Sequence, residues 1–205
     1  MFSVVSGIPE QQQGGIIMKN TKQIKTQTLV LAAILTGLVV LLQFLGSFIK
    51  FGPFSISLVL IPIVIGTATC GAAVGAWLGL IFGIVVLVSG DAAPFLAVSV
   101  PGTIITVLTK GIACGYVSGL VYKLAEKKNR TVAVAAAAVT CPVVHTVVFL
   151  VGCFLFFMDT IASWAGGDVA NYIIFVLVGG NFLFELLLNI IISPAVVRIL
   201  NYKLK

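Results

Sequence analysis

Charged residues are scarce in this sequence of 205 residues. Asp, Glu, Lys and Arg together make up 9% of the chain, whereas hydrophobic residues make up 60%. A water-soluble domain carries about a quarter charged residues, so this chain has too few to cover a globule in water. The composition therefore predicts a protein whose main solvent is lipid.

Signatures of catalysis and metal binding are also missing. The sequence contains no G-x-x-x-x-G-K-[ST] phosphate loop, no H-E-x-x-H motif and no C-x-x-C pair. A metal site built on His145 is not expected, because the sequence has no second histidine and no typical Cys–His zinc spacing. We therefore predict no enzymatic activity, no metal site and no cofactor, and we interpret the four cysteines as small buried apolar residues. If the protein drove uphill transport, the energy would have to come from an ion gradient or from partner ATPases, because the phosphate loop is missing.

Long apolar runs dominate what is present. About 20 apolar residues cross the hydrocarbon core as a helix, and only helices or closed barrels satisfy the backbone in lipid. The runs lack the alternation of barrel strands, which favours helices. We predict an all-α integral membrane protein with six transmembrane helices. The predicted spans are residues 28–49, two spans within 54–90, and residues 99–123, 132–157 and 172–199. A turn at 66–71 divides the stretch 54–90, and a loop covers 159–171.

The basic residues decide between five spans and six. Cytoplasmic segments are rich in Lys and Arg, and six spans leave only Lys50 on the opposite side. We therefore predict a multi-pass membrane protein with both termini in the cytoplasm. The net charge of +6 then reports topology and does not indicate a nucleic-acid partner. The residues on the predicted cytoplasmic side are Lys19, Lys22, Lys25, Lys123, Lys127, Lys128, Arg130, Arg198, Lys203 and Lys205.

The first 17 residues differ from the rest of the chain. They contain no basic residue and no long apolar run, so they do not form a signal peptide. Met18 opens a basic segment that is a plausible translation start. We predict that residues 1–17 are a disordered extension or lie upstream of the true start, and that residues 18–205 form a single transmembrane domain.

Small residues recur every fourth position in three of the spans. Such stripes let two helix backbones approach closely, either within one chain or between subunits. In the first span, packing within the chain and docking of another subunit are both open. The stripes are Gly71, Gly75, Gly79 and Gly83; Gly111, Gly115 and Gly119; and, in the first span, Ala32 with Thr36 and Ala33 with Gly37.

Three ionisable residues lie near the middle of predicted spans, namely Lys110, His145 and Glu185. Asn181 and Asn189 lie four residues on either side of Glu185 and share its helix face. Ionisable groups at this depth cost several kcal/mol unless they are paired or hydrated. They should therefore converge on a common interior. One alternative is a structural Lys110–Glu185 ion pair with His145 bonded nearby, and the other is a substrate pocket.

Aromatic residues flank the spans on the predicted outer side. Phe51 and Phe54 surround a Gly-Pro break, and Trp164 lies in the last outer loop. Such residues commonly anchor a protein at the membrane interface. The functional alternative is a gate or wall over an outward-facing pocket, where the rings would stack on an aromatic ligand.

Several segments together resemble a known transporter family. They are FGPFSISLVLIPIVIG from residue 51, GAAVGAWLG from 71, PGT from 101, KGIACGYVSGL from 110, CPVVHT from 141 and NFLFEL from 181. The chain from about Lys19 to Leu200 resembles the substrate-binding (S) components of energy-coupling factor (ECF) transporters, with the riboflavin-type group as the best likeness. The resemblance implies a six-helix subunit that holds a vitamin in its outer half.

The resemblance also implies partners and site residues. It implies a transmembrane coupling (T) subunit and two cytoplasmic ATPase subunits, with a small-residue face of the first helix as the contact with the coupling subunit. The matching positions here are Ala32 and Thr36, or Ala33 and Gly37. The expected substrate is a vitamin, with riboflavin first and pantothenate second. The expected substrate-binding residues are Phe51, Phe54, Lys110, His145, Trp164, Asn181, Glu185 and Asn189.

One alternative function stays open at this point. A stand-alone, proton-coupled secondary transporter would use Lys110, His145 and Glu185 as a proton relay. Inverted repeats would support that alternative, and the sequence shows none.

Overall fold

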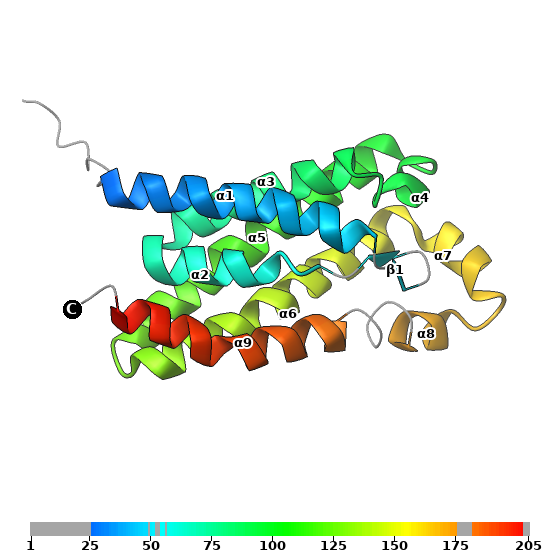
Figure 1. The fold of residues 1–205 in the computed structure, drawn as a ribbon. Coiled ribbons are helices and arrows are strands. Elements are labelled where there is room, and N and C mark those ends of the chain that lie inside the picture. The colour runs from blue at the N-terminus through cyan, green and yellow to red at the C-terminus, as the bar shows by residue number, and fades with distance from the viewer. Residues whose placement is uncertain (1–25, 49, 52–53, 56, 176–181, 203–205) are drawn as a thin grey trace, which may run out of the picture.

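The computed structural model describes residues 26–48, 50–51, 54–55, 57–175 and 182–202. Figure 1 shows long helices lying side by side along one axis, with short helices gathered at one end. The elements are α1 (Thr26–Ser47), β1 (Lys50–Phe51), β2 (Phe54–Ser55), α2 (Leu60–Cys70), α3 (Ala72–Val88), α4 (Ala93–Leu96), α5 (Val100–Glu126), α6 (Arg130–Phe156), α7 (Met158–Ala165), α8 (Val169–Asn171) and α9 (Leu183–Tyr202).

Each of the six predicted apolar segments contains a helix. The long charge-free stretch divides at Gly71, which ends α2 and begins α3 with a φ of 94°, a conformation that favours glycine. Among the described residues, three helices are long and apolar enough to cross a membrane, namely α1, α5 and α6. The α2 and α3 helices have 11 and 17 residues. The apolar helices agree with a membrane protein, and the number of six spans stays a prediction.

Two local predictions were incomplete. The segment 159–171, predicted as a loop, contains α7 and α8 separated by Gly166 and Gly167, both with positive φ. The break near Phe51 forms a short antiparallel pair, β1–β2, in which Phe51 lies opposite Phe54. In the described residues, the regular structure is therefore helical except for this hairpin of two short strands. Residues 1–17 lie outside the described part of the chain.

Polar residues set the beginnings of the two longest helices. The Ser99 hydroxyl accepts a hydrogen bond from the Gly102 backbone N–H at 3.3 Å, and Pro101 occupies the first turn of α5. The Asn129 side chain accepts from the Thr131 N–H at 2.8 Å and begins α6. These caps leave a tight turn at residues 127–129, so α5 and α6 lie antiparallel along much of their length.

Glycines bring α3 against α5. A Cβ added to Gly79 would clash with the Gly111 carbonyl, and one added to Gly115 would clash with the carbonyl of Gly75. Only hydrogen atoms at these positions allow the two backbones to approach this closely. The two glycine stripes therefore form one contact inside the chain, which we call the glycine seam.

The two ends of the bundle differ in charge. One end carries the beginning of α1, the α5–α6 turn and the end of α9; the opposite end carries α4, α7 and α8 (Figure 1). We call these the basic end and the loop end. Among the described residues, Lys123, Lys127, Lys128, Arg130 and Arg198 belong to elements at the basic end, with Glu126 as the one acid there, and Asp91, Asp159 and Asp168 lie at the loop end, with Lys50 of β1 on that side. This segregation agrees with the predicted topology, and the side that each end faces stays a prediction.

Candidate functional site

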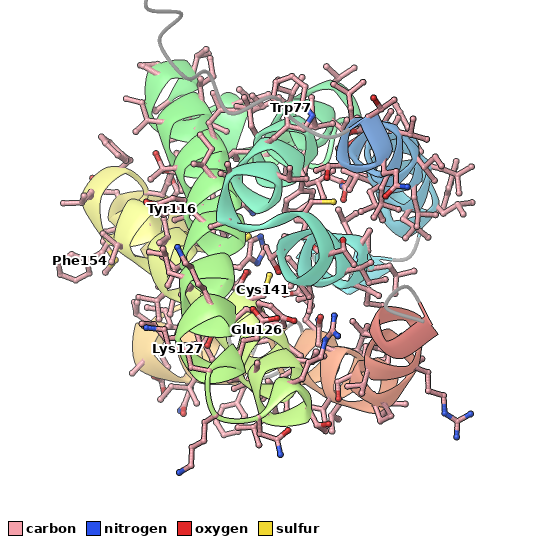
Figure 2. All side chains as sticks on the ribbon, turned by 90° about the vertical axis from the view of Figure 1, so that its left-hand side faces the viewer. Trp77, Tyr116, Glu126, Lys127, Cys141 and Phe154 are labelled. Carbon is pink, nitrogen blue, oxygen red and sulfur yellow. The ribbon has the colours of Figure 1, made fainter. Side chains whose placement is uncertain are left out.

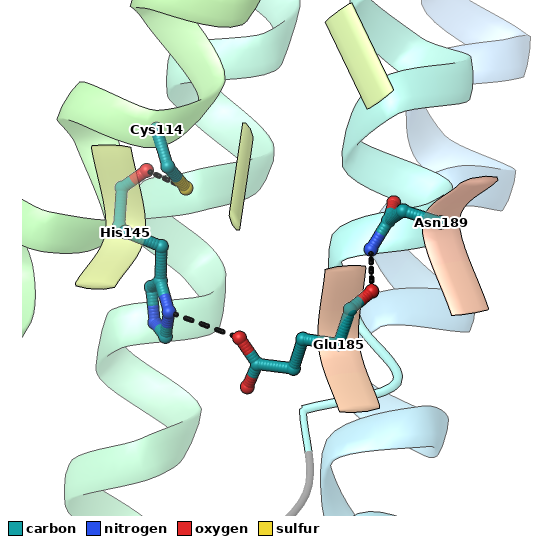
Figure 3. Close-up of polar contacts among 5 residues, drawn as sticks. Cys114, His145, Glu185 and Asn189 are labelled. Carbon is teal, nitrogen blue, oxygen red and sulfur yellow. Dashed lines mark hydrogen bonds and ion pairs between the residues drawn. The ribbon is translucent and has the colours of Figure 1, made fainter. Parts of the chain in front are cut away.

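A buried polar contact joins α6 to α9. His145 is 4% exposed and Glu185 is fully buried, and His145 Nδ1 lies 3.5 Å from Glu185 Oε2 (Figure 3). This separation allows electrostatic attraction but is too long for a good hydrogen bond. The structure thus brings together two of the three ionisable residues that the sequence places at mid-span.

Lys110 lies on α5, with its ammonium facing α6. Its Nζ is 4.8 Å from the ring centroid of Phe149, which is a cation–π distance. Its charge also interacts with that of Glu185. Among the described residues, the one acid–base contact within 4.0 Å joins His145 to Glu185, so Lys110 and Glu185 form no ion pair. The charged groups share one interior, and Lys110 keeps its hydrogen-bond donors uncommitted to an acidic residue there.

Several buried polar atoms in this interior lack a hydrogen-bond partner among the described residues. They are both carboxylate oxygens of Glu185, Nε2 of His145 and Oγ1 of Thr106. Leaving such an atom unbonded costs about 1–3 kcal/mol, and more for a charged group. This cost is recovered when a polar molecule bonds to them. We call Thr106, Lys110, His145 and Glu185 the polar interior.

Thr106 was missed by the sequence analysis. Its signal was its position one turn before Lys110, on the same face of α5. A Cβ added to Gly152 on α6 would clash with the Thr106 side chain, so the two residues pack together. A threonine in an apolar helix attracts little notice because its hydroxyl can bond to its own backbone. Here Oγ1 makes no such bond, which gives this hydroxyl a place in the site.

Of the two predicted asparagines, the structure describes Asn189 and not Asn181. Asn189 Nδ2 donates a hydrogen bond to the backbone carbonyl of Glu185 at 2.8 Å (Figure 3). Its amide therefore holds the turn of α9 that carries the carboxylate, which is a positioning role. Asn181 lies outside the described residues, and its predicted contact with substrate stays a prediction.

The predicted aromatic residues lie toward the loop end. Trp164 on α7 packs edge-on against Phe95, with ring centroids 5.6 Å apart. Phe95 also contacts Phe149, the ring beneath Lys110, at 5.7 Å. Trp164 is thus connected to the polar interior through two rings. The side chains of Phe51 and Phe54 lie outside the described part of the structure, so their predicted role as pocket walls stays a prediction.

A second polar contact near the loop end was also missed. Gln43 on α1 is 2% exposed, and its Nε2 donates to Asp91 Oδ2 at 2.5 Å. The Ser89 hydroxyl donates to the same oxygen at 3.2 Å. A buried amide bonded to a carboxylate ties α1 to the turn between α3 and α4. This contact fixes the end of α1 from which the β1–β2 hairpin departs.

An apolar groove of about 600 Å³ lies between α1 and α3. It includes three of the four predicted partner-interface positions, Ala32, Ala33 and Thr36. Gly37 does not line it, and a Cβ added there would have no atom within 4 Å. Figure 2, seen from the basic end, shows Trp77 on the side of the bundle that carries α1. The full lining is Thr28, Leu29, Ala32, Ala33, Thr36, Ala73, Val74 and Trp77.

These features define an α-helical membrane protein with a polar interior and an apolar groove on one flank. Residues 27–200 match the family described as ECF transporter, substrate-specific component. The chain therefore belongs to this family, whose members are the S components for vitamin uptake, and the resemblance drawn from the sequence is confirmed. A family of transporters agrees with the prediction that the protein is not an enzyme.

One relative bears on the substrate. Over 197 residues the chain is 27% identical to the pantothenic acid transporter PanT of Lactococcus lactis subsp. cremoris (strain MG1363). The alignment covers 88% of this chain and 96% of that protein. No solved structure matches the chain. Riboflavin, the first expectation from the sequence, is not supported by this comparison.

Proposed function

We propose that this chain captures a vitamin bearing a carboxylate, with pantothenate as the leading candidate, and passes it to an ECF importer. The supporting observation is Lys110. A cation inside an apolar bundle is costly without an anion beside it, and no acidic side chain among the described residues forms an ion pair with it. A ligand carboxylate meets this requirement, and the similarity to PanT indicates the same class of ligand.

The proposal includes the assembly. The chain would be a six-span subunit of the bacterial plasma membrane with both termini in the cytoplasm, working with a T subunit and two ATPase subunits. The groove that contains Ala32, Ala33 and Thr36 is the proposed contact with the T subunit. Its apolar lining suits a helix with small residues on its surface.

Equilibrium binding to the purified protein in detergent tests the substrate. Lys110→Met keeps the unbranched side chain, one atom shorter, and removes its charge, and we expect it to weaken pantothenate binding about tenfold or more. Lys123→Met, an exposed lysine at the basic end, is the matched control and should bind as the wild type does. Pantothenol, whose alcohol replaces the carboxylate, should bind weakly to the wild type and be insensitive to Lys110→Met.

Three results would count against this proposal. Equal affinity of Lys110→Met and the wild type for pantothenate would remove Lys110 from the site. Tight binding of riboflavin with no binding of pantothenate would restore the first expectation from the sequence. Uptake that continues without any coupling ATPase but stops with the proton gradient would favour the secondary transporter.

A further inference from the structure

The groups of the polar interior occupy successive depths along the bundle. Thr106 packs against Gly152 of α6, and Lys110, one turn further along α5, lies over Phe149. His145 comes one turn beyond Phe149 on α6 and lies beside Glu185. From Gly152 to His145 the axial distance is about 10 Å, and from Phe149 to His145 about 6 Å, at 1.5 Å per residue. From the loop end inward, the order is therefore Thr106, Lys110 and the His145–Glu185 pair.

The hydrogen-bonding groups change from donors to acceptors along this order of residues. Lys110 offers only donors and a positive charge, and the Thr106 hydroxyl can add another donor. An ionised Glu185 offers only acceptors, and neutral His145 offers one donor and one acceptor. Both Glu185 oxygens and His145 Nε2 lack hydrogen-bond partners among the described residues. The part nearer the loop end suits a carboxylate, and the inner part suits a group that can donate hydrogen bonds.

We propose that Glu185, with His145, recognises hydroxyl groups of the ligand, while Lys110 and Thr106 hold its carboxylate. This inference rests on the proposed function and adds an orientation to it. The ligand lies along the bundle axis with its acid toward the loop end and its hydroxyls inward. Pantothenate has this chemistry, with a carboxylate at one end and two hydroxyls at the other. The reverse orientation would place the carboxylate beside that of Glu185, where like charges repel.

The test pairs two ligands with matched variants. The ligands are pantothenate and N-(3,3-dimethylbutanoyl)-β-alanine, which has the same skeleton and carboxylate without the hydroxyls. Wild-type protein should bind pantothenate about tenfold or more tightly than the analogue. Glu185→Met should weaken the binding of pantothenate alone, which brings the ratio of the two affinities close to one. Glu185→Gln should retain part of the preference for pantothenate over the analogue. Glu126→Gln, a carboxylate change at the basic end, should keep all of it.

Thr106 tests the orientation separately. Thr106→Val should weaken both ligands by the same factor, because both carry the carboxylate. Ser118→Ala removes a buried hydroxyl of the same helix that bonds to the Gly115 carbonyl at 3.1 Å, and it should change neither affinity. Loss of pantothenate binding alone in Thr106→Val would reverse the orientation and overturn the inference.

The outcomes separate this inference from the proposed function. If Glu185→Met weakens both ligands equally while the protein stays folded, Glu185 supports the structure and the inference is wrong, yet the carboxylate site stands. If Glu185→Met does not fold, the same ratio of affinities for pantothenate and the analogue is measured for Glu185→Gln and His145→Gln. An unchanged ratio in both variants would show that the inference is wrong. If wild-type protein binds neither ligand, the proposed substrate class fails and the inference fails with it.

Discussion

Two small-residue faces of this protein have the same sequence pattern and different surroundings. The glycine seam joins α3 to α5, where the backbone of one helix fills the space left by the glycines of the other. The face of α1 that contains Ala32 and Ala33 borders a groove of about 600 Å³, and no other part of the described chain fills it. One face completes the fold, whereas the other remains open to a partner or to lipid.

The difference shows what a small-residue stripe does and does not establish. The stripe specifies that backbones can come close, but it does not specify whether the second backbone belongs to the same chain. Between α3 and α5, Gly75 lies against Gly115 and Gly79 lies against Gly111, so the two stripes meet in register. On α1 the neighbouring helix brings Trp77, which is 51% exposed, and the surface stays hollow. A mutation should therefore affect folding at the seam and assembly at the groove.

The largest effect is expected at the seam. Gly79→Ala places a methyl group against the Gly111 carbonyl, so α3 and α5 must separate, and overpacking of this kind costs about 1–3 kcal/mol. Thermal unfolding in detergent measures this loss. Gly37→Ala is the matched control because its Cβ meets nothing within 4 Å, and it should stabilise α1 by up to about 1 kcal/mol. Equal melting temperatures for the two variants would show that the seam is not tightly packed.

A smaller effect is expected in the groove, and on assembly rather than stability. Ala33→Leu fills part of the groove from an exposed position, so unfolding should change by less than about 0.5 kcal/mol. Co-purification with the coupling subunit should fall about tenfold because the partner helix no longer fits. Ligand binding should stay at the wild-type level. Loss of ligand binding together with assembly would show that this face belongs to the fold.

The smallest effect is expected from Trp77→Ala. Trp77 contributes a half-exposed ring to the wall of the groove, so its removal should weaken assembly by only a few-fold and leave the melting temperature nearly unchanged. Phe154→Ala is the control, since this ring is 70% exposed on α6, on a different side of the bundle (Figure 2). Equal losses of assembly for Trp77→Ala and Phe154→Ala would contradict a specific groove.

Sequence reasoning worked best where glycine or charged residues interrupt the apolar pattern. The turns near Gly71 and Asn129 could be predicted because glycine and charged residues interrupt long apolar runs. The proximity of His145 and Glu185 followed from the cost of placing charge at bilayer depth. The family followed from motifs spread over nearly the whole chain.

Other features depend on how neighbouring helices are rotated, which the sequence does not display. Lys110 was expected either to pair with Glu185 or to meet a ligand, and its contact with the Phe149 ring was not anticipated. Gln43 and Thr106 went unnoticed because amides and hydroxyls cost less in an apolar interior than full charges do. The α7 and α8 helices were predicted as loop because the segment contains Asp159, Asp168 and two glycines, and α8 with three residues is too short to show a periodicity.

The shortness of α2 has a consequence for the backbone that leads into it. Eleven residues extend about 16 Å, roughly half of a hydrocarbon core of about 30 Å. If α2 is one of the spans, as the sequence predicts, residues 57–59 lie at bilayer depth without a helix. Such backbone survives at that depth only when protein or water surrounds it, and Ser57, Val59 and Leu60 are all buried. The entrance to α2 is thus lined by the protein's own side chains, which take the place of the water that this non-helical backbone would otherwise need.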